Sequence, residues 1–167
     1  IFLIMFREPI AHAYSLRSQH IRFSEMQKVD PSITFYMNLL GHHEFGENSL
    51  PFIYEPNQFI SFNQYRKHDI NYWLSQWILT YEWILKKVEK GSCQVITVCY
   101  ELMCSSPQYC DMICDYLEVP RKIMKSKFCI GKSNSIAIDE LNMNNFLLTR
   151  AELIYESLVN MASRHVI

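Results

Sequence analysis

The stretch Ile1-Phe-Leu-Ile-Met-Phe-Arg-Glu-Pro9 decides the fold of this chain. Its first six residues are continuously apolar and rich in β-branched and aromatic side chains, which predicts a strand buried on both faces. Pro9 suits the first turn of a helix, where its missing N–H is not needed. The sequence therefore predicts a strand, a short turn that carries Arg7, and a helix to about residue 22.

Arg7 is a candidate anion-binding residue because of this position. Ligands of open α/β sheets bind outside the carboxyl ends of the strands, and the planar guanidinium group matches the geometry of a phosphate. Ser15 follows eight residues later and could add a hydroxyl donor. The alternative is that Arg7 pairs with a carboxylate and Ser15 is an ordinary surface residue.

The rest of the chain alternates helices with one more strand. The long helix at 68–90 has apolar residues at steps of three and four, and the apolar run at 94–99 predicts a second buried strand. Proline and glycine mark 41–67 as an irregular, lid-like segment. Further helices are expected at about 31–40, 107–117 and 145–163, with a short one from Pro120.

Strands separated by helices imply parallel pairing and an α/β fold. We expect one domain over residues 1–167, rich in helix, with an incomplete parallel sheet, because two strands make a poor sheet alone. The chain begins inside an apolar run without Met, so further upstream sequence is expected.

Composition excludes several classes of function. A net charge of −1 argues against a general nucleic-acid binder, and no apolar run reaches the length of a membrane span. Four scattered glycines rule out a Walker loop and a dinucleotide-binding G-x-G-x-x-G. The six cysteines contain no C-x-x-C pair, so no metal site is expected. The compartment stays open between the Golgi lumen and the cytoplasm.

Arg7-Glu-Pro-Ile-Ala-His-Ala-Tyr-Ser15, directly after an apolar strand, resembles the 3′-phosphate motif of sulfotransferases that use 3′-phosphoadenosine 5′-phosphosulfate (PAPS). In that family an arginine ends a strand, a serine follows eight residues on, and both contact the 3′-phosphate. The resemblance implies this role for Arg7 and Ser15.

A second block is similar to the same family. Trp73 and Trp77 precede a strand that leads into Tyr100-Glu101-Leu102, and Tyr116-Leu-Glu-Val-Pro120 follows a helix. Tyr116 stands where the family has Phe, and Glu118 stands where it has Gly. The resemblance places Tyr100 beside the adenine, although an aromatic residue at a strand end is also an ordinary core residue.

A third block, Cys129-Ile-Gly131-Lys132-Ser133, resembles a loop of the heparan-sulfate type of Golgi sulfotransferases. It implies that Lys132 lies near the 3′-phosphate, whereas a solvated surface lysine is the alternative. The match ends at Asn134, where the family has Lys.

The resemblance implies a P-loop NTPase-like, three-layer sulfotransferase fold. It also implies transfer of a sulfuryl group from PAPS to a hydroxyl or amine of an acceptor, with 3′-phosphoadenosine 5′-phosphate (PAP) as product and no metal. The third block favours a glycan acceptor over a small molecule. The family's phosphosulfate loop and base lie upstream of the first block, so no catalytic residue is assigned, and His12, His20, His42 and His43 are expected to be surface or capping residues.

Two other functions stay open. One is a degenerate, non-catalytic family member that binds the nucleotide or a partner. The other is a different phosphate-binding α/β enzyme, such as a nucleotide kinase, against which the missing Walker loop argues. The acceptor and the oligomeric state are not predicted.

Overall fold

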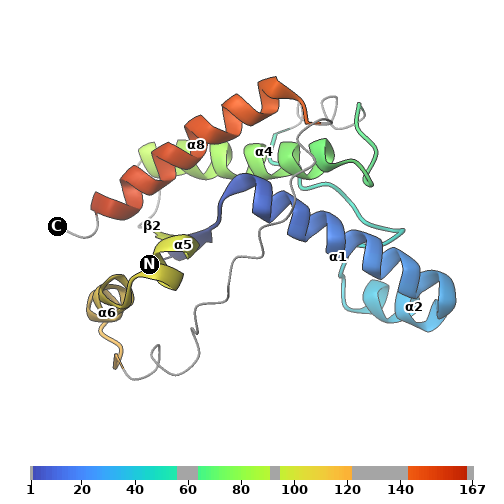
Figure 1. Cartoon of the computed structure of the whole chain (residues 1–167). Coiled ribbons are helices and arrows are strands. Elements are labelled where there is room, and N and C mark those ends of the chain that lie inside the picture. Colours follow the sequence, from blue (N-terminus) through green and yellow to red (C-terminus); the bar gives the residue numbers. More distant parts are fainter. Residues whose placement is uncertain (1, 56–63, 91–94, 122–142, 165–167) are drawn as a thin grey trace.

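The computed structural model describes residues 2–55, 64–90, 95–121 and 143–164. Its elements form a helix-rich α/β arrangement around two parallel strands (Figure 1). In chain order they are β1 (Phe2–Phe6), α1 (Pro9–Val29), α2 (Pro31–Leu39), α4 (Ile70–Glu89), β2 (Val95–Cys99), α5 (Tyr100–Ser105), α6 (Pro107–Tyr116) and α8 (Asn145–Arg164).

The two strands pair in parallel, as expected, with Phe2 opposite Val95 and Phe6 opposite Cys99. β2 is buried along its whole length. β1 is not, because the side chains of Phe2, Leu3 and Met5 are 64%, 43% and 42% exposed. The prediction that the first strand is buried on both faces was therefore wrong. Among the described residues β1 lies at the edge of the sheet, and only Phe6 at its end is fully covered.

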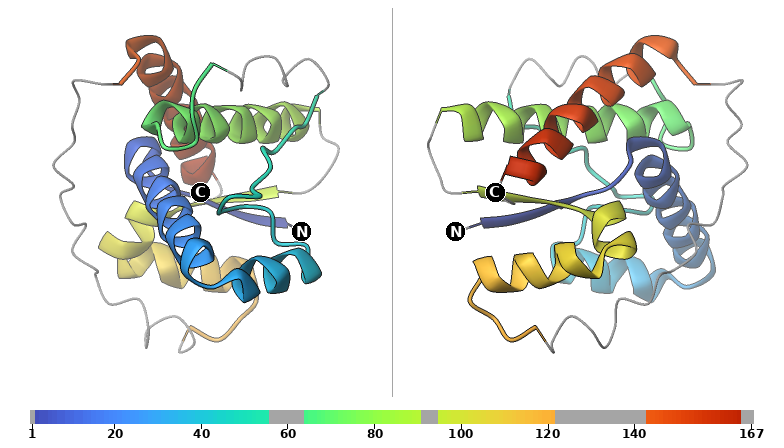
Figure 2. Two further views of the ribbon diagram at one scale, coloured as in Figure 1. Left: turned by 90° about the vertical axis from the view of Figure 1, so that its right-hand side faces the viewer. Right: turned by 60° about the vertical axis from the view of Figure 1, so that its left-hand side comes forward.

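Helices cover the sheet from both sides (Figure 2). On one side α4 and α8 pack together over Phe6 and Cys99, and α1 packs against α4. On the other side Ile96 and Val98 of β2 pack against Met103 of α5 and Ile113 of α6. β2 thus lies between two apolar layers, which explains why it is fully buried.

α4 is the central helix of the larger core. The predicted apolar stripe is present, and the first half of the helix is buried on all sides, since α1 and α8 pack against it. Its N-terminus is capped by Asp69, whose carboxylate accepts the Asn71 N–H at 2.9 Å. The guanidinium of Arg150 on α8 donates two hydrogen bonds to Glu82, at 2.5 and 2.6 Å, which fixes α8 along α4.

α1 extends to Val29, seven residues beyond its predicted end. The buried face of α1 includes Ala13, His20, Ser24 and Gln27. The sequence prediction followed apolar residues only, so it missed the part of this face that is formed by polar side chains. His20 is 2% exposed and its ring packs against those of His68 and Trp73. The expectation that His20 is a surface or capping residue was wrong.

Two further boundaries differ from the sequence prediction. β2 ends at Cys99, and Tyr100 and Glu101 begin α5, a short helix that the sequence did not predict. The predicted helix from Pro120 falls almost wholly outside the described residues.

α6 ends with an unusual residue in the left-handed region. Glu118 has φ 54°, and the Val119 N–H and Glu118 N–H donate to the carbonyls of Cys114 and Asp115. This is a Schellman motif, whose left-handed position is normally glycine because a Cβ atom clashes there. Glu118 is also a position where the sequence departs from the sulfotransferase pattern that it resembles, which has glycine there.

We therefore expect Glu118→Gly to stabilise the protein. Relief of the Cβ clash is worth about 1–2 kcal/mol, and the extra freedom of glycine in the unfolded chain removes about half of that. A net gain of about 0.5–1 kcal/mol raises the thermal midpoint by about 1–4 °C. Glu118→Ala keeps the Cβ atom and serves as the control, so an equal rise in both variants contradicts the strain.

His20 should make stability depend on pH. Burial, then the charges of His68 and Lys67, lower the pKa of His20 below its ordinary 6.5. The unfolded chain therefore binds a proton that the folded chain does not, and stability falls as pH drops below about 6.5. We expect His20→Phe to flatten this decline in denaturant titrations between pH 7 and 5. Ala13→Gly, which weakens the same helix without removing a histidine, should keep the slope.

Candidate functional site

The carboxyl ends of the two strands meet and bring two predicted site residues together. Arg7 directly follows β1 and Tyr100 directly follows β2. The guanidinium carbon of Arg7 lies over the Tyr100 ring, 5.2 Å from its centroid, which is a cation–π contact. Residues from two separate motifs, 93 positions apart, thus form one surface at the end of the sheet.

The guanidinium group of Arg7 is available for an anion. Arg7 is partly buried, and within the described ranges no carboxylate lies at ion-pair distance from it and no acceptor hydrogen-bonds to it. By contrast, Arg17 donates to the His68 carbonyl at 2.6 Å, and Arg150 is paired with Glu82. The alternative in which Arg7 pairs with a carboxylate is not seen in this part of the chain.

Ser15 and Lys132 are not part of this contact. Ser15 is exposed on α1, on the side opposite Ala13, because two residues span about 200° of a helix. No hydrogen bond joins it to Arg7 or Tyr100 in the described structure. Lys132 lies outside the described residues, as do Cys129, Gly131 and Ser133.

The N-terminus of α1 is already occupied by a carboxylate of the chain. Glu8 is the N-cap residue, and its two carboxylate oxygens accept the N–H groups of Ile10 and Ala11, at 3.0 and 2.6 Å. These first-turn donors are the ones that bind anions at helix ends. An anion at this site must therefore be held by side chains.

Glu101 connects the strand ends to α8. One of its carboxylate oxygens accepts the Glu8 N–H at 3.0 Å, and the other accepts the Tyr155 hydroxyl at 3.2 Å and the Cys99 thiol at 3.4 Å. Burial raises the pKa of Tyr155 and of Cys99, so both keep the protons that they donate. Sequence analysis predicted only that Tyr155 lies on the apolar side of its helix. Because a buried tyrosine hydroxyl needs a hydrogen-bond partner, that position could have indicated a polar contact such as the one with Glu101.

His12 lies in the same region and was wrongly expected to be a surface or capping residue. It is partly buried, and its Nδ1 atom is buried without a hydrogen-bond partner. Burial, then the charge of Arg7, lowers the pKa of His12, while Glu101 opposes the shift. The imidazole is therefore neutral near pH 7.

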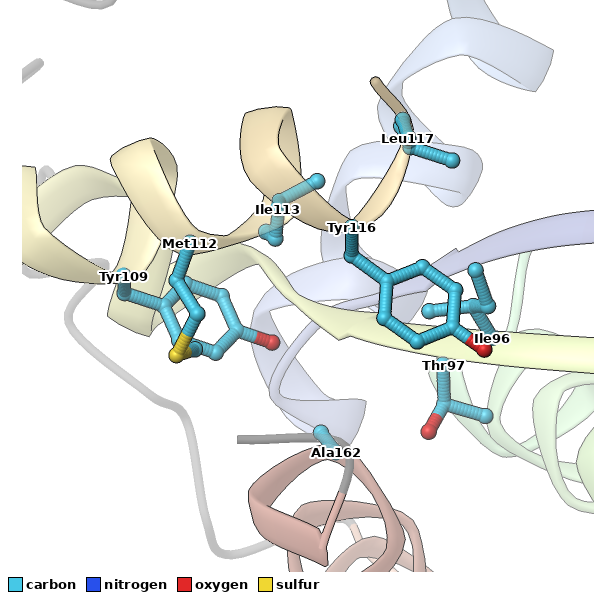
Figure 3. Close-up of a pocket in the computed structure, with 8 residues that line it drawn as sticks. All are labelled: Ile96, Thr97, Tyr109, Met112, Ile113, Tyr116, Leu117 and Ala162. Atoms are coloured by element: carbon cyan, nitrogen blue, oxygen red, sulfur yellow. The ribbon is translucent and has the colours of Figure 1, made fainter. Parts of the chain in front are cut away.

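Two hollows differ in what they can hold. One, of about 180 Å³, lies between α1, α4 and residues 44–52 and includes His12 in its lining. The other, of about 20 Å³, lies between β2, α6 and the end of α8. Figure 3 shows its lining, with Ile96 and Thr97 of β2, Ala162 of α8, and side chains at and just after α6. It has room for about one water molecule, so it is not a ligand site.

Neither a metal site nor a membrane-spanning helix is seen among the described residues. Within the described ranges, no three His, Cys, Asp or Glu side chains gather as a metal site would require. No described helix combines the length and the apolar character needed to span a bilayer.

Comparisons with known proteins leave the family of the chain undetermined. No family model, no curated protein and no solved structure matches it. Its function therefore has to be argued from its own residues.

The contacts of Glu101 predict its effect on stability. Glu101→Ala removes the acceptor of the Glu8 N–H and of the Tyr155 hydroxyl, and we expect it to lower the free energy of unfolding by about 1–3 kcal/mol. Glu101→Gln keeps one oxygen acceptor and should lose less. The exposed Glu156 on α8 provides the control. If Glu156→Ala destabilises the protein as much in urea titrations, the assigned contacts are not the cause.

Proposed function

We propose that this chain belongs to a PAPS-dependent sulfotransferase and binds the adenosine 3′-phosphate half of the nucleotide. The observation that carries the proposal is the contact between Arg7 and Tyr100 at the strand ends. A cation without a carboxylate partner among the described residues and an aromatic ring are the two groups that a 3′-phosphate and an adenine require. Their motifs are the two in which the resemblance to this family is strongest.

Each residue has a separate part in this proposal. Arg7 holds the 3′-phosphate through its guanidinium N–H groups, and Ser15 adds a hydroxyl donor from α1. Tyr100 offers one face of its ring to the adenine, since Arg7 covers the other. Lys132 adds a second cation from the glycan-type loop.

The proposal also includes the type of α/β fold. Helices on both sides of parallel strands support a P-loop NTPase-like, three-layer sulfotransferase fold. The exposed Phe2, Leu3 and Met5 on β1 support a wider sheet than the two described strands, because an apolar edge strand is normally paired or covered.

The proposed reaction moves a sulfuryl group from PAPS to an acceptor hydroxyl or amine. The bond between sulfur and the bridging phosphate oxygen breaks, a bond from sulfur to the acceptor atom forms, and PAP leaves. A base takes the acceptor's proton, and cationic donors stabilise the charge on the bridging oxygen. We favour a glycan acceptor because of the Gly131-Lys132-Ser133 block.

A second candidate is nucleotide binding without transfer. The observation that favours it is the two carboxylates beside Arg7 in the structure: Glu101 accepts the Glu8 N–H, and the Glu8 carboxylate caps α1. Negative charge near Arg7 weakens the binding of a phosphate there, as expected of a degenerate family member that holds the nucleotide less tightly than an enzyme does.

Calorimetric titration with PAP tests the proposal. We expect Arg7→Ala to weaken binding at least tenfold, because charge-assisted hydrogen bonds are worth about 1.5–3 kcal/mol. Arg7→Lys should recover only part of the loss, since lysine lacks the planar fork. An affinity for PAP that Arg7→Ala leaves within a factor of two overturns the site.

Two controls make the titration specific. Arg22 is exposed on the same helix, and Arg22→Ala should bind PAP as the unmodified chain does. Adenosine 5′-phosphate lacks the 3′-phosphate, so its weaker binding should not respond to Arg7→Ala. PAP binding without turnover of PAPS over a panel of glycan and small-molecule acceptors supports the second candidate.

A further inference from the structure

The larger cavity has the volume and the aromatic walls of a small-molecule site, and its lining includes neither Arg7 nor Tyr100. Its volume of about 180 Å³ slightly exceeds that of an engineered apolar cavity that binds benzene. Its walls are mainly aromatic and come from three separate segments. Phe45 lies against Trp73 with 5.8 Å between ring centroids, and Trp77 lies against Tyr81 with 4.6 Å. These rings line a preformed, mainly apolar pocket that is partly open to solvent.

Three residues of the cavity wall carry buried polar atoms without a hydrogen-bond partner. They are His12 Nδ1, Gln76 Nε2 and Trp77 Nε1. Gln76 Oε1 accepts the Phe52 N–H at 3.1 Å, which fixes the orientation of the amide. Trp73, by contrast, donates its indole N–H to the Lys67 carbonyl at 2.7 Å. Orphaned N–H donors are costly and rare in folded proteins, and the N–H groups of Gln76 and Trp77, two residues of one cavity wall, lack an acceptor in the described structure.

The charges at the cavity argue against an anionic ligand, and its unpaired N–H donors argue against a cationic one. Of the residues that line it, Glu44 carries a carboxylate, and no lysine or arginine is among them. His12 is neutral near pH 7, because burial and Arg7 lower its pKa. Nothing in this lining therefore compensates the charge of an anionic ligand. The unpaired groups of Gln76 and Trp77 are N–H donors, so they require an acceptor oxygen on the ligand.

We propose that this cavity binds a small, neutral, planar aromatic molecule that carries a carbonyl oxygen. The ring packs among Phe45, Trp73 and Trp77. The oxygen accepts from the Trp77 indole or the Gln76 amide after a small side-chain rotation, because protein atoms cover both N–H groups in the structure.

Acetophenone and α-methylstyrene are a matched pair of probes, since they share a shape and differ in the carbonyl oxygen. In a purely apolar cavity the hydrocarbon binds more tightly, because the carbonyl loses its hydrogen bonds to water. With the orphaned donors satisfied, we expect acetophenone to bind at least threefold more tightly in calorimetric titrations. Tighter binding of α-methylstyrene overturns the proposal. Binding of neither probe also overturns it and would mean that the cavity holds only water.

The three tryptophans locate the site by NMR. We expect acetophenone to move the Trp77 indole N–H signal downfield and to leave that of Trp83 unchanged, because Trp83 stacks on Tyr54 outside the cavity lining. Assignment comes from single Trp→Phe variants. A shift at Trp83 without one at Trp77 contradicts the site.

Two variants separate cavity filling from a general loss of structure. Leu16 lines the cavity, and Leu16→Phe should reduce acetophenone binding at least tenfold. Leu153→Phe, at an exposed position of α8, should leave it unchanged. Trp77→Phe keeps an aromatic wall but removes the donor, so the preference for acetophenone should disappear. None of these readouts involves a nucleotide, so their failure is distinguishable from failure of PAP binding.

Discussion

The carboxylate of Glu101 is the contact on which the site depends. Its oxygens accept the Glu8 N–H at the turn after β1 and the Tyr155 hydroxyl on α8, while its backbone begins α5 after β2. One side chain thereby fixes three elements at the carboxyl ends of the strands. Arg7 and Tyr100 flank Glu8 and Glu101 in sequence, so the same contact sets the distance between the guanidinium and the ring.

Much of the fold followed from local patterns in the sequence. Apolar spacing identified α4 and α8, and prolines marked the starts of α1, α2 and α6. The errors arose where tertiary contacts override local preference. The end of α1 carries the polar residues Ser24 and Gln27, which are both buried, and the Gln27 side chain accepts the Glu47 N–H at 2.7 Å. The exposure of β1 depends on which elements cover it, and this is not readable from an apolar run.

The site was predictable only in part. Strand-end position and the resemblance to a family motif predicted Arg7 as a candidate, and the resemblance alone predicted Tyr100. The roles of Glu101 and Tyr155 depend on contacts 93 and 54 residues apart, for which one sequence offers no periodicity. His12 was misplaced for a related reason. Its burial comes from packing around the cavity, which requires α1, α4 and residues 44–52 to be assembled.

The scarcity of glycine and the capping of α1 both indicate that a phosphate beside β1 would have to be bound by side chains. Glycine-rich loops bind phosphates through backbone N–H groups, and four scattered glycines provide no such loop. Helix ends are the usual substitute, but the Glu8 carboxylate takes the first-turn donors of α1. A phosphate beside β1 would then rely on side chains, and a half-buried guanidinium is the strongest such donor. Arg7, which lacks a carboxylate partner within the described ranges, meets that requirement.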